Sequence, residues 1–188
     1  MQHPFHFLRI IRGYLSLVPW QLIFFLIYLI KACSFLIWLE KHQNILISGP
    51  TGVGKSYLAC AFGQWACRYG FTVAYHRWPR MLGDFLAARG EGHYLKYLQQ
   101  LTKVDLLIID DFGLNSLADT DKKDLLEIIE DRYMVKSTLI ASQLPIKDWH
   151  AFIGDPTIAD AVCDRLFHVA HKFELKGGSM RKITEIID

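Results

Sequence analysis

The sequence has little cysteine, and its cysteines and histidines show no metal-binding pattern. Its 188 residues include four cysteines and eight histidines. The cysteines lack both C-x-x-C spacing and the density of a disulfide framework, and no two histidines are spaced H-x-x-x-H. These absences argue against a secreted disulfide scaffold and against a zinc site. We expect the cysteines to be small buried residues of a protein in a reducing compartment.

The chain also lacks a strong excess of charge of either sign. A formal net charge of +2 gives no overall basic signature, so any nucleic-acid site would have to be a local patch. We find no internal repeat, low-complexity tract or Pro-rich or Gly/Ser-rich linker. At this length one domain of ordinary size is expected.

Charged residues are almost missing from the N-terminal part of the chain. Between Gly13 and Leu39 the only Lys, Arg, Asp or Glu is Lys31. The Leu, Ile and Phe of residues 14–30 would favour membrane insertion by an amount on the order of several kcal/mol. However, the basic residues on the two sides set no orientation, and too few residues separate this stretch from the next predicted strand. Membrane association is therefore not expected, and a composition boundary is placed near residue 38.

From residue 44 onward, apolar runs of strand length alternate with stretches of helical periodicity. Strands are predicted at 44–48, 72–76, 105–109, 138–142 and 171–175. Helices are predicted at 55–69, 79–101 with a break at 89–92, from Asp121 to Tyr133, and at 156–167. Asp121 and Asp155 are expected to cap the last two. This alternation predicts an α/β protein with a doubly wound parallel sheet.

One stretch carries a phosphate-binding pattern. The residues GPTGVGKS, Gly49 to Ser56, fit G-x-x-x-x-G-K-[ST] between a predicted strand and a predicted helix. Backbone N–H groups there can converge on phosphates, Lys55 would reach the β and γ oxygens, and the Ser56 hydroxyl would bind Mg²⁺. The alternative is a Gly-rich turn without a ligand. The predicted ATP-binding residues are Gly49, Pro50, Thr51, Gly52, Val53, Gly54, Lys55, Ser56 and Tyr57.

The strand LLIIDD, Leu106 to Asp111, ends in two acids. It would deliver Asp110 to the phosphate end of the sheet, where a carboxylate can hold Mg²⁺ through water. Asp111 is well placed to orient an attacking water, which favours ATP hydrolysis over transfer to another substrate. The alternative is a pair of solvated acids at the end of a strand.

Two further polar residues are candidates for contact with the γ-phosphate. Gln143 follows the fourth strand, where its amide could sense the phosphate or hold the water, or could simply be a polar loop residue. Arg165 lies on the last predicted helix. Its guanidinium could stabilise the transferred phosphoryl group, including one bound to a neighbouring subunit, or could form a surface salt bridge.

A basic stretch with interleaved aromatic residues is the candidate for DNA contact. Side chains on this helical region could follow phosphates without reading bases, or could form a solvated charged face. The stretch contains Arg77, Arg80, Arg89, His93 and Lys96, together with Trp78, Phe85 and Tyr94.

Six stretches together resemble one known family. They are NILISGPTGVGKSYLACAFG, VDLLIIDDFGL, DLLEIIEDRY, STLIASQLP, DWHAFIGDPTIADAVCDRL and ELKGGSMRK. From about Trp38 to Lys182 the sequence resembles the IstB-type ATPases, helpers of bacterial insertion-sequence transposition that are related to DnaC-type helicase loaders. The resemblance implies a P-loop NTPase of AAA+ type over residues 38–188, a three-layer sandwich with a five-stranded parallel sheet.

The resemblance also implies partners and roles. It implies a cytoplasmic, Mg²⁺-dependent homo-oligomeric ATPase that binds double-stranded DNA and assists a cognate transposase. By position it makes Gln143 a sensor, Arg165 an arginine finger and Arg181 a second sensor. The alternatives are a DnaC-like helicase-loading ATPase and a degenerate nucleotide-binding remnant.

The resemblance does not extend to residues 1–37. We hypothesise that this segment is not native family sequence and arose from a frameshift, a wrong start or a fused fragment. A membrane anchor and a buried N-terminal helix are the alternatives.

Overall fold

The computed structural model describes residues 35–180, and within them five strands form one parallel sheet. The order across the sheet is β2-β3-β4-β1-β5, so β1 lies between β4 and β5. Every neighbouring pair is parallel, which confirms the expected sheet. The strands are β1 (Asn44–Ser48), β2 (Val73–Arg77), β3 (Leu106–Phe112), β4 (Ser137–Ser142) and β5 (Ala170–Glu174).

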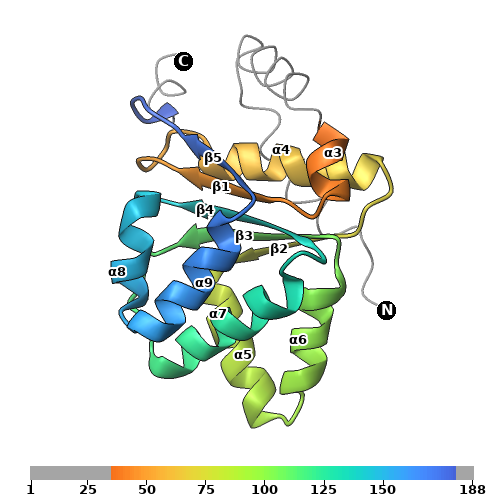
Figure 1. The fold of residues 1–188 in the computed structure, drawn as a ribbon, viewed down its shortest axis with the longest axis vertical. Helices are drawn as coiled ribbons and strands as arrows, with labels where there is room; N and C mark the ends of the chain where they lie inside the picture. The colour runs from red at the N-terminus through yellow and green to blue at the C-terminus, as the bar shows by residue number, and fades with distance from the viewer. Residues whose placement is uncertain (1–34, 181–188) are drawn as a thin grey trace, which may run out of the picture.

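Helices cover both faces of this sheet, so the expected three-layer sandwich is also confirmed (Figure 1). One face carries α3 (Phe35–Glu40) and α4 (Lys55–Arg68). The other carries α5 (Trp78–Gly90), α6 (Tyr94–Lys103), α7 (Asp119–Arg132), α8 (Trp149–Ile153) and α9 (Pro156–Phe167), with a short 3₁₀ turn at Ile146–Asp148 before α8.

The two layers of core follow from the alternation of side chains along each strand. In β3, Ile108 packs in the cluster under α4, whereas Ile109 packs in the cluster under α5 to α9. Both residues are fully buried. Unbroken apolar runs are required here because each strand is covered on both faces.

The starts of the last helices differ in one respect from the sequence prediction. Asp155 caps α9 as expected, with its carboxylate accepting a hydrogen bond from the Ile158 amide at 3.0 Å. The prediction that Asp121 caps α7 is wrong. The N-cap residue of α7 is Ala118, and Asp121, three residues later, accepts from the Ala118 amide at 2.9 Å. Helix α8 was not predicted because it spans only five residues.

One buried charge ties three elements together. Arg132, at the end of α7, is 1% exposed. Its guanidinium donates to the carbonyls of Leu101 (2.7 Å) and Val104 (2.9 Å) and to the Thr138 hydroxyl (3.1 Å). Burial lowers the pKa of Arg132 to about 9, and these acceptors compensate for its desolvation. Arg132 thus joins α6, the segment between α6 and β3, and β4 at the edge of the sheet where the strands begin.

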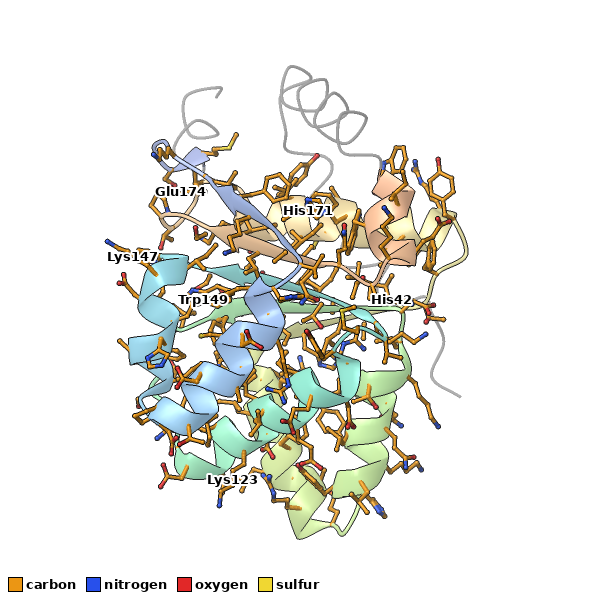
Figure 2. The ribbon with its side chains drawn as sticks, in the orientation of Figure 1. His42, Lys123, Lys147, Trp149, His171 and Glu174 are labelled. Atoms are coloured by element: carbon orange, nitrogen blue, oxygen red, sulfur yellow. The ribbon has the colours of Figure 1, made fainter. Side chains whose placement is uncertain are left out.

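The opposite edge, where the parallel strands end, is where a ligand site is expected. Figure 2 labels Glu174 and Lys147 on this side and His42 on the other.

Within residues 35–180, no helix is both long enough and apolar enough to cross a membrane. The predicted boundary near residue 38 falls inside α3, where Trp38 and Leu39 are buried in the core. The hypothesis about residues 1–37 falls almost wholly outside the described residues and stays a prediction.

Candidate nucleotide-binding site

The loop between β1 and α4 has a backbone that only glycine adopts easily. Gly52 (φ 82°) and Gly54 (φ 102°) lie in the left-handed region. A Cβ on Gly52 would lie 2.3 Å from the Ser179 hydroxyl oxygen. That approach exists because the chain after β5 runs back over the loop, and the Met180 amide donates to the Gly52 carbonyl at 3.0 Å. The loop is therefore held between β1 and the segment that follows β5.

Lys55 is folded into this loop. The residue is 8% exposed, and its ammonium donates to the carbonyls of Gly49 and Pro50, both at 2.8 Å. Helix α4 begins at Lys55 after Gly54, with no side-chain cap on its first amides. These first-turn amides and the helix dipole favour an anion at this point. The loop and α4 together have the chemistry of a phosphate site.

Asp110 lies at the end of β3 and is 2% exposed. One carboxylate oxygen accepts from the Tyr75 hydroxyl at 2.7 Å, and the other accepts from the Asp111 amide at 2.9 Å. Burial and the charge of Asp110 raise the pKa of Tyr75, and the same two causes raise the pKa of Cys60 to about 12. Both residues therefore remain protonated beside the Asp110 carboxylate.

A bulge in β3 allows the side chains of both Asp110 and Asp111 to contact the neighbouring strand β2. The register with β4 shifts between Ile109 and Phe112, and Asp111 has a left-handed φ of 58°. In a regular strand Phe112 would share a face with Asp110, but Phe112 packs instead with Ile109 in the opposite core. Asp111 accepts from the Arg77 Nε at 2.7 Å, and Arg77 lies two residues after Tyr75 on β2. Both acids thus meet side chains from one face of β2.

Gln143 contacts the phosphate loop directly. Its amide oxygen accepts from the Thr51 hydroxyl at 2.6 Å. The contact is possible because β4 lies beside β1 in the sheet, so the residues after both strands meet. The structure thus brings together the loop, both acids and Gln143 at one edge of the sheet.

The donor set fits Mg²⁺. Ser56 and Cys60 are one turn apart on the same face of α4, and Cys60 is close enough to Asp110 for that charge to raise its pKa. The Ser56 hydroxyl and the Asp110 carboxylate are oxygen donors of the kind that Mg²⁺ takes beside substrate phosphates. Within residues 35–180 no group of three His, Cys, Asp or Glu could cage a metal. A Mg²⁺ ion held by the Ser56 and Asp110 oxygens would take its remaining ligands from phosphates and water.

Arg165 is not brought to this site. Its guanidinium pairs with Glu130 at 2.8 Å, and its carbonyl accepts from the Asn44 amide group at 3.4 Å. Asn44 begins β1, whereas the loop follows the end of β1, about 13 Å further along at the usual rise of a strand. Arg165 thus lies toward the edge of the sheet opposite the loop. Arg181 lies outside the described residues.

Several residues of the basic stretch are buried in the core or form ion pairs with acidic residues. Trp78 and Phe85 belong to the core, at 0% and 1% exposed. Arg89 pairs with the buried Asp124. Arg77 pairs with Asp111. Arg80, His93 and Lys96 of this stretch are exposed and form no such ion pair with another residue of the described range 35–180.

The sequence reasoning missed the role of β2. It placed Arg77 among candidate DNA contacts and assigned nothing to Tyr75. The signal available in the sequence was the polar run Tyr75, His76 and Arg77, at and just after the end of the second predicted strand. Only the register of β2 on β3, with Arg77 opposite Asp110, shows which acids these side chains meet.

Comparisons with known proteins agree with this geometry. Residues 28–186 match the family model described as IstB-like ATP binding protein. The chain belongs to this family. The matched span begins ten residues before Trp38, so it includes residues 28–37, which were expected to lie outside the resemblance.

Two relatives with similar sequences come from Sinorhizobium fredii (strain NBRC 101917 / NGR234). The insertion sequence ATP-binding protein y4pL is 51% identical over 145 residues, covering 77% of this chain and 59% of the relative. The insertion sequence ATP-binding protein y4uH is 49% identical over 148 residues, covering 79% and 60%. This chain spans less than two thirds of the length of either relative.

Solved structures show the same fold. AMPPCP-bound DnaA from Aquifex aeolicus aligns with a TM-score of 0.66 and 21% identity, covering 81% of this chain and 47% of that one. The DnaC helicase loader aligns with a TM-score of 0.64 and 19% identity, covering 76% and 86%. This IstB-like chain therefore has the fold of the AAA+ P-loop ATPases.

Proposed function

We propose that this chain is a Mg²⁺-dependent ATPase that assists DNA transposition. The observation that carries the proposal is the meeting of the phosphate loop, Asp110, Asp111 and Gln143 at one edge of the sheet. Membership of the IstB-like family and about half identity to proteins named for insertion sequences support the biological role.

Each residue has a distinct part in this proposal. The loop from Gly49 to Tyr57 binds the triphosphate, and Lys55 exchanges its two loop carbonyls for phosphate oxygens. Ser56 and Asp110 would hold Mg²⁺, which would neutralise charge on the phosphates when bound. Asp111 orients the attacking water. Gln143 senses the γ-phosphate by donating to it from its side-chain NH₂ group, while its amide oxygen accepts from the Thr51 hydroxyl.

Two arginines complete the proposed site. Since Arg165 lies toward the edge of the sheet opposite its own loop, it would serve the nucleotide of a neighbouring copy in a homo-oligomer. The Met180 amide donates a hydrogen bond to the Gly52 carbonyl of the loop. Arg181, the next residue in the chain, is proposed as the second sensor.

The proposed partners are duplex DNA and a transposase in the cytoplasm. Three exposed basic residues support contact with DNA phosphates, namely Arg80, His93 and Lys96. A helicase-loading role is the second candidate, favoured by the structural likeness to the DnaC loader. At 19% identity that likeness shows the fold alone, whereas the relatives named for insertion sequences favour the transposition role.

The experiment measures ATP binding and hydrolysis on the full chain, with and without duplex DNA. Lys55→Ala is expected to lose both activities because the phosphates lose their cation. Asp111→Asn is expected to bind MgATP normally and to hydrolyse it about 100-fold more slowly or worse, because the water loses its base. Asn also tolerates the left-handed backbone of Asp111.

Lys123→Ala is the matched control, since Lys123 is an exposed lysine on α7 (Figure 2). It should leave both activities unchanged. Binding of MgATP by the wild type without any turnover, with or without DNA, would identify a degenerate remnant and overturn the proposal.

A further inference from the structure

Tyr75 reaches the Asp110 carboxylate from the neighbouring strand. Its hydroxyl donates to one carboxylate oxygen at 2.7 Å, while its ring packs against the core between the sheet and α4. The register of β2 on β3 produces this contact, because Tyr75 lies opposite Ile108, two residues before Asp110. The hydroxyl that contacts Asp110 thus belongs to β2, whereas Asp110 itself belongs to β3.

This hydrogen bond leaves part of the carboxylate available. A carboxylate offers about four lone pairs on two oxygens. The Tyr75 hydroxyl uses one and the Asp111 amide uses one on the other oxygen. The two bonds fix the plane of the carboxylate, and each oxygen keeps a lone pair for a metal-bound water.

We propose that Tyr75 is a positioning residue that orients Asp110 for Mg²⁺. The proposal rests on the proposed function, because it gives Asp110 the role of a metal ligand. Groups that hold a metal-binding carboxylate in place commonly alter metal affinity 10–100-fold when removed. A Tyr75 that served packing alone would act through its ring, and its hydroxyl would be dispensable.

Tyr75→Phe separates these roles, since it removes the hydroxyl and keeps the ring. The full chain is titrated with the fluorescent analogue mant-ATP, in EDTA and across a series of Mg²⁺ concentrations. We expect the Mg²⁺ concentration that gives half-maximal tightening of nucleotide binding to rise about tenfold. Affinity for the nucleotide in EDTA is expected to stay unchanged.

Tyr97→Phe is the matched control. Tyr97 is a half-buried phenol on α6, on the other face of the sheet, whose hydroxyl donates to the Asp84 carboxylate at 3.4 Å. It should leave the Mg²⁺ dependence at the wild-type value. In an Asp110→Asn background, Tyr75→Phe should add nothing, because the carboxylate that it orients is gone.

The outcomes distinguish this inference from the proposed function. If the wild type shows no Mg²⁺-dependent nucleotide binding, the proposed function fails and Tyr75 has no metal site to serve. If the wild type responds to Mg²⁺ and Tyr75→Phe matches it, only the role of Tyr75 is overturned. An equal loss of affinity in EDTA and in Mg²⁺ would show general damage to the site and would also overturn it.

Discussion

At the scale of single residues, the two acids of LLIIDD have different partners. Asp110 is buried and accepts hydrogen bonds from the neutral Tyr75 hydroxyl and from an amide. Asp111 is partly exposed and is paired with the charged Arg77, whose side chain is 63% exposed. The pair partly neutralises the acid proposed to orient water, so Arg77 should restrain hydrolysis.

Arg77→Ala is expected to raise the basal ATPase rate by up to about fivefold, since an exposed pair contributes about 1 kcal/mol or less. Higher salt should shrink the difference from the wild type because salt screens the pair. Steady-state rates at two ionic strengths test this. Arg80→Ala is the control, as Arg80 is exposed on α5 and should not alter the basal rate. A fall in the rate of Arg77→Ala would contradict the restraining role.

At the scale of elements, Asp105, the residue before β3, is hydrogen-bonded to residues that lie just before β2 and β4. Its carboxylate accepts from the Thr72 amide (2.8 Å) and hydroxyl (2.7 Å) and from the Lys136 ammonium (2.7 Å). Partial burial alone would raise the pKa of Asp105, but the hydrogen bonds from Lys136 and Thr72 lower it to about 2. The native state therefore favours the ionised form.

Asp105→Asn is expected to destabilise the fold by about 1 kcal/mol near pH 7, allowing for partial exposure. Because the pKa is lowered on folding, this contribution is present above the unfolded value near 4 and is lost as the pH falls toward 2. Urea unfolding measured from pH 7 down to pH 3 should therefore show that the difference in free energy of unfolding between variant and wild type becomes smaller. Asp131→Asn, at an exposed position on α7, is the matched control. A gap that stays constant with pH would contradict the assignment.

At the scale of the whole molecule, the placement of Arg165 concerns assembly. Arg165 and the phosphate loop lie toward opposite edges of one sheet, so a single copy cannot bring them together. A head-to-tail arrangement of copies would place the Arg165 of one copy near the nucleotide of the next.

Mixing two inactive variants tests this arrangement. Arg165→Ala keeps a complete loop site, and Asp111→Asn keeps the arginine. In an equal mixture about a quarter of the interfaces would pair an intact site with an intact arginine, so about a quarter of wild-type ATPase should return. Lys123→Ala mixed with Asp111→Asn shows the activity expected from dilution. Co-assembly without recovered activity would contradict the role of Arg165.

The sequence by itself determined the fold class, the phosphate loop and the two candidate acids. These features depend on local signals, namely the spacing of glycines and Lys55 between two elements and apolar runs that end in polar residues. It also singled out Gln143, whose amide oxygen accepts from the Thr51 hydroxyl of the loop in the structure, and its role toward the γ-phosphate stays a prediction. Where it failed, as with Asp121, the error was one of element boundaries, which pattern places only to within a few residues.

Only the tertiary structure decided what surrounds the acids. The bulge after Ile109 turns the side chain of Asp111 toward β2, where that of Asp110 also lies. The register of β2 on β3 places Tyr75 in contact with Asp110 and Arg77 in contact with Asp111. It also decided that Arg165 lies at the far edge and that Trp78 is core and so cannot stack on a base. The physical reason is that strand register and bulges arise from packing between segments distant in the chain. No local pattern of residues encodes which side chains that packing will place in contact.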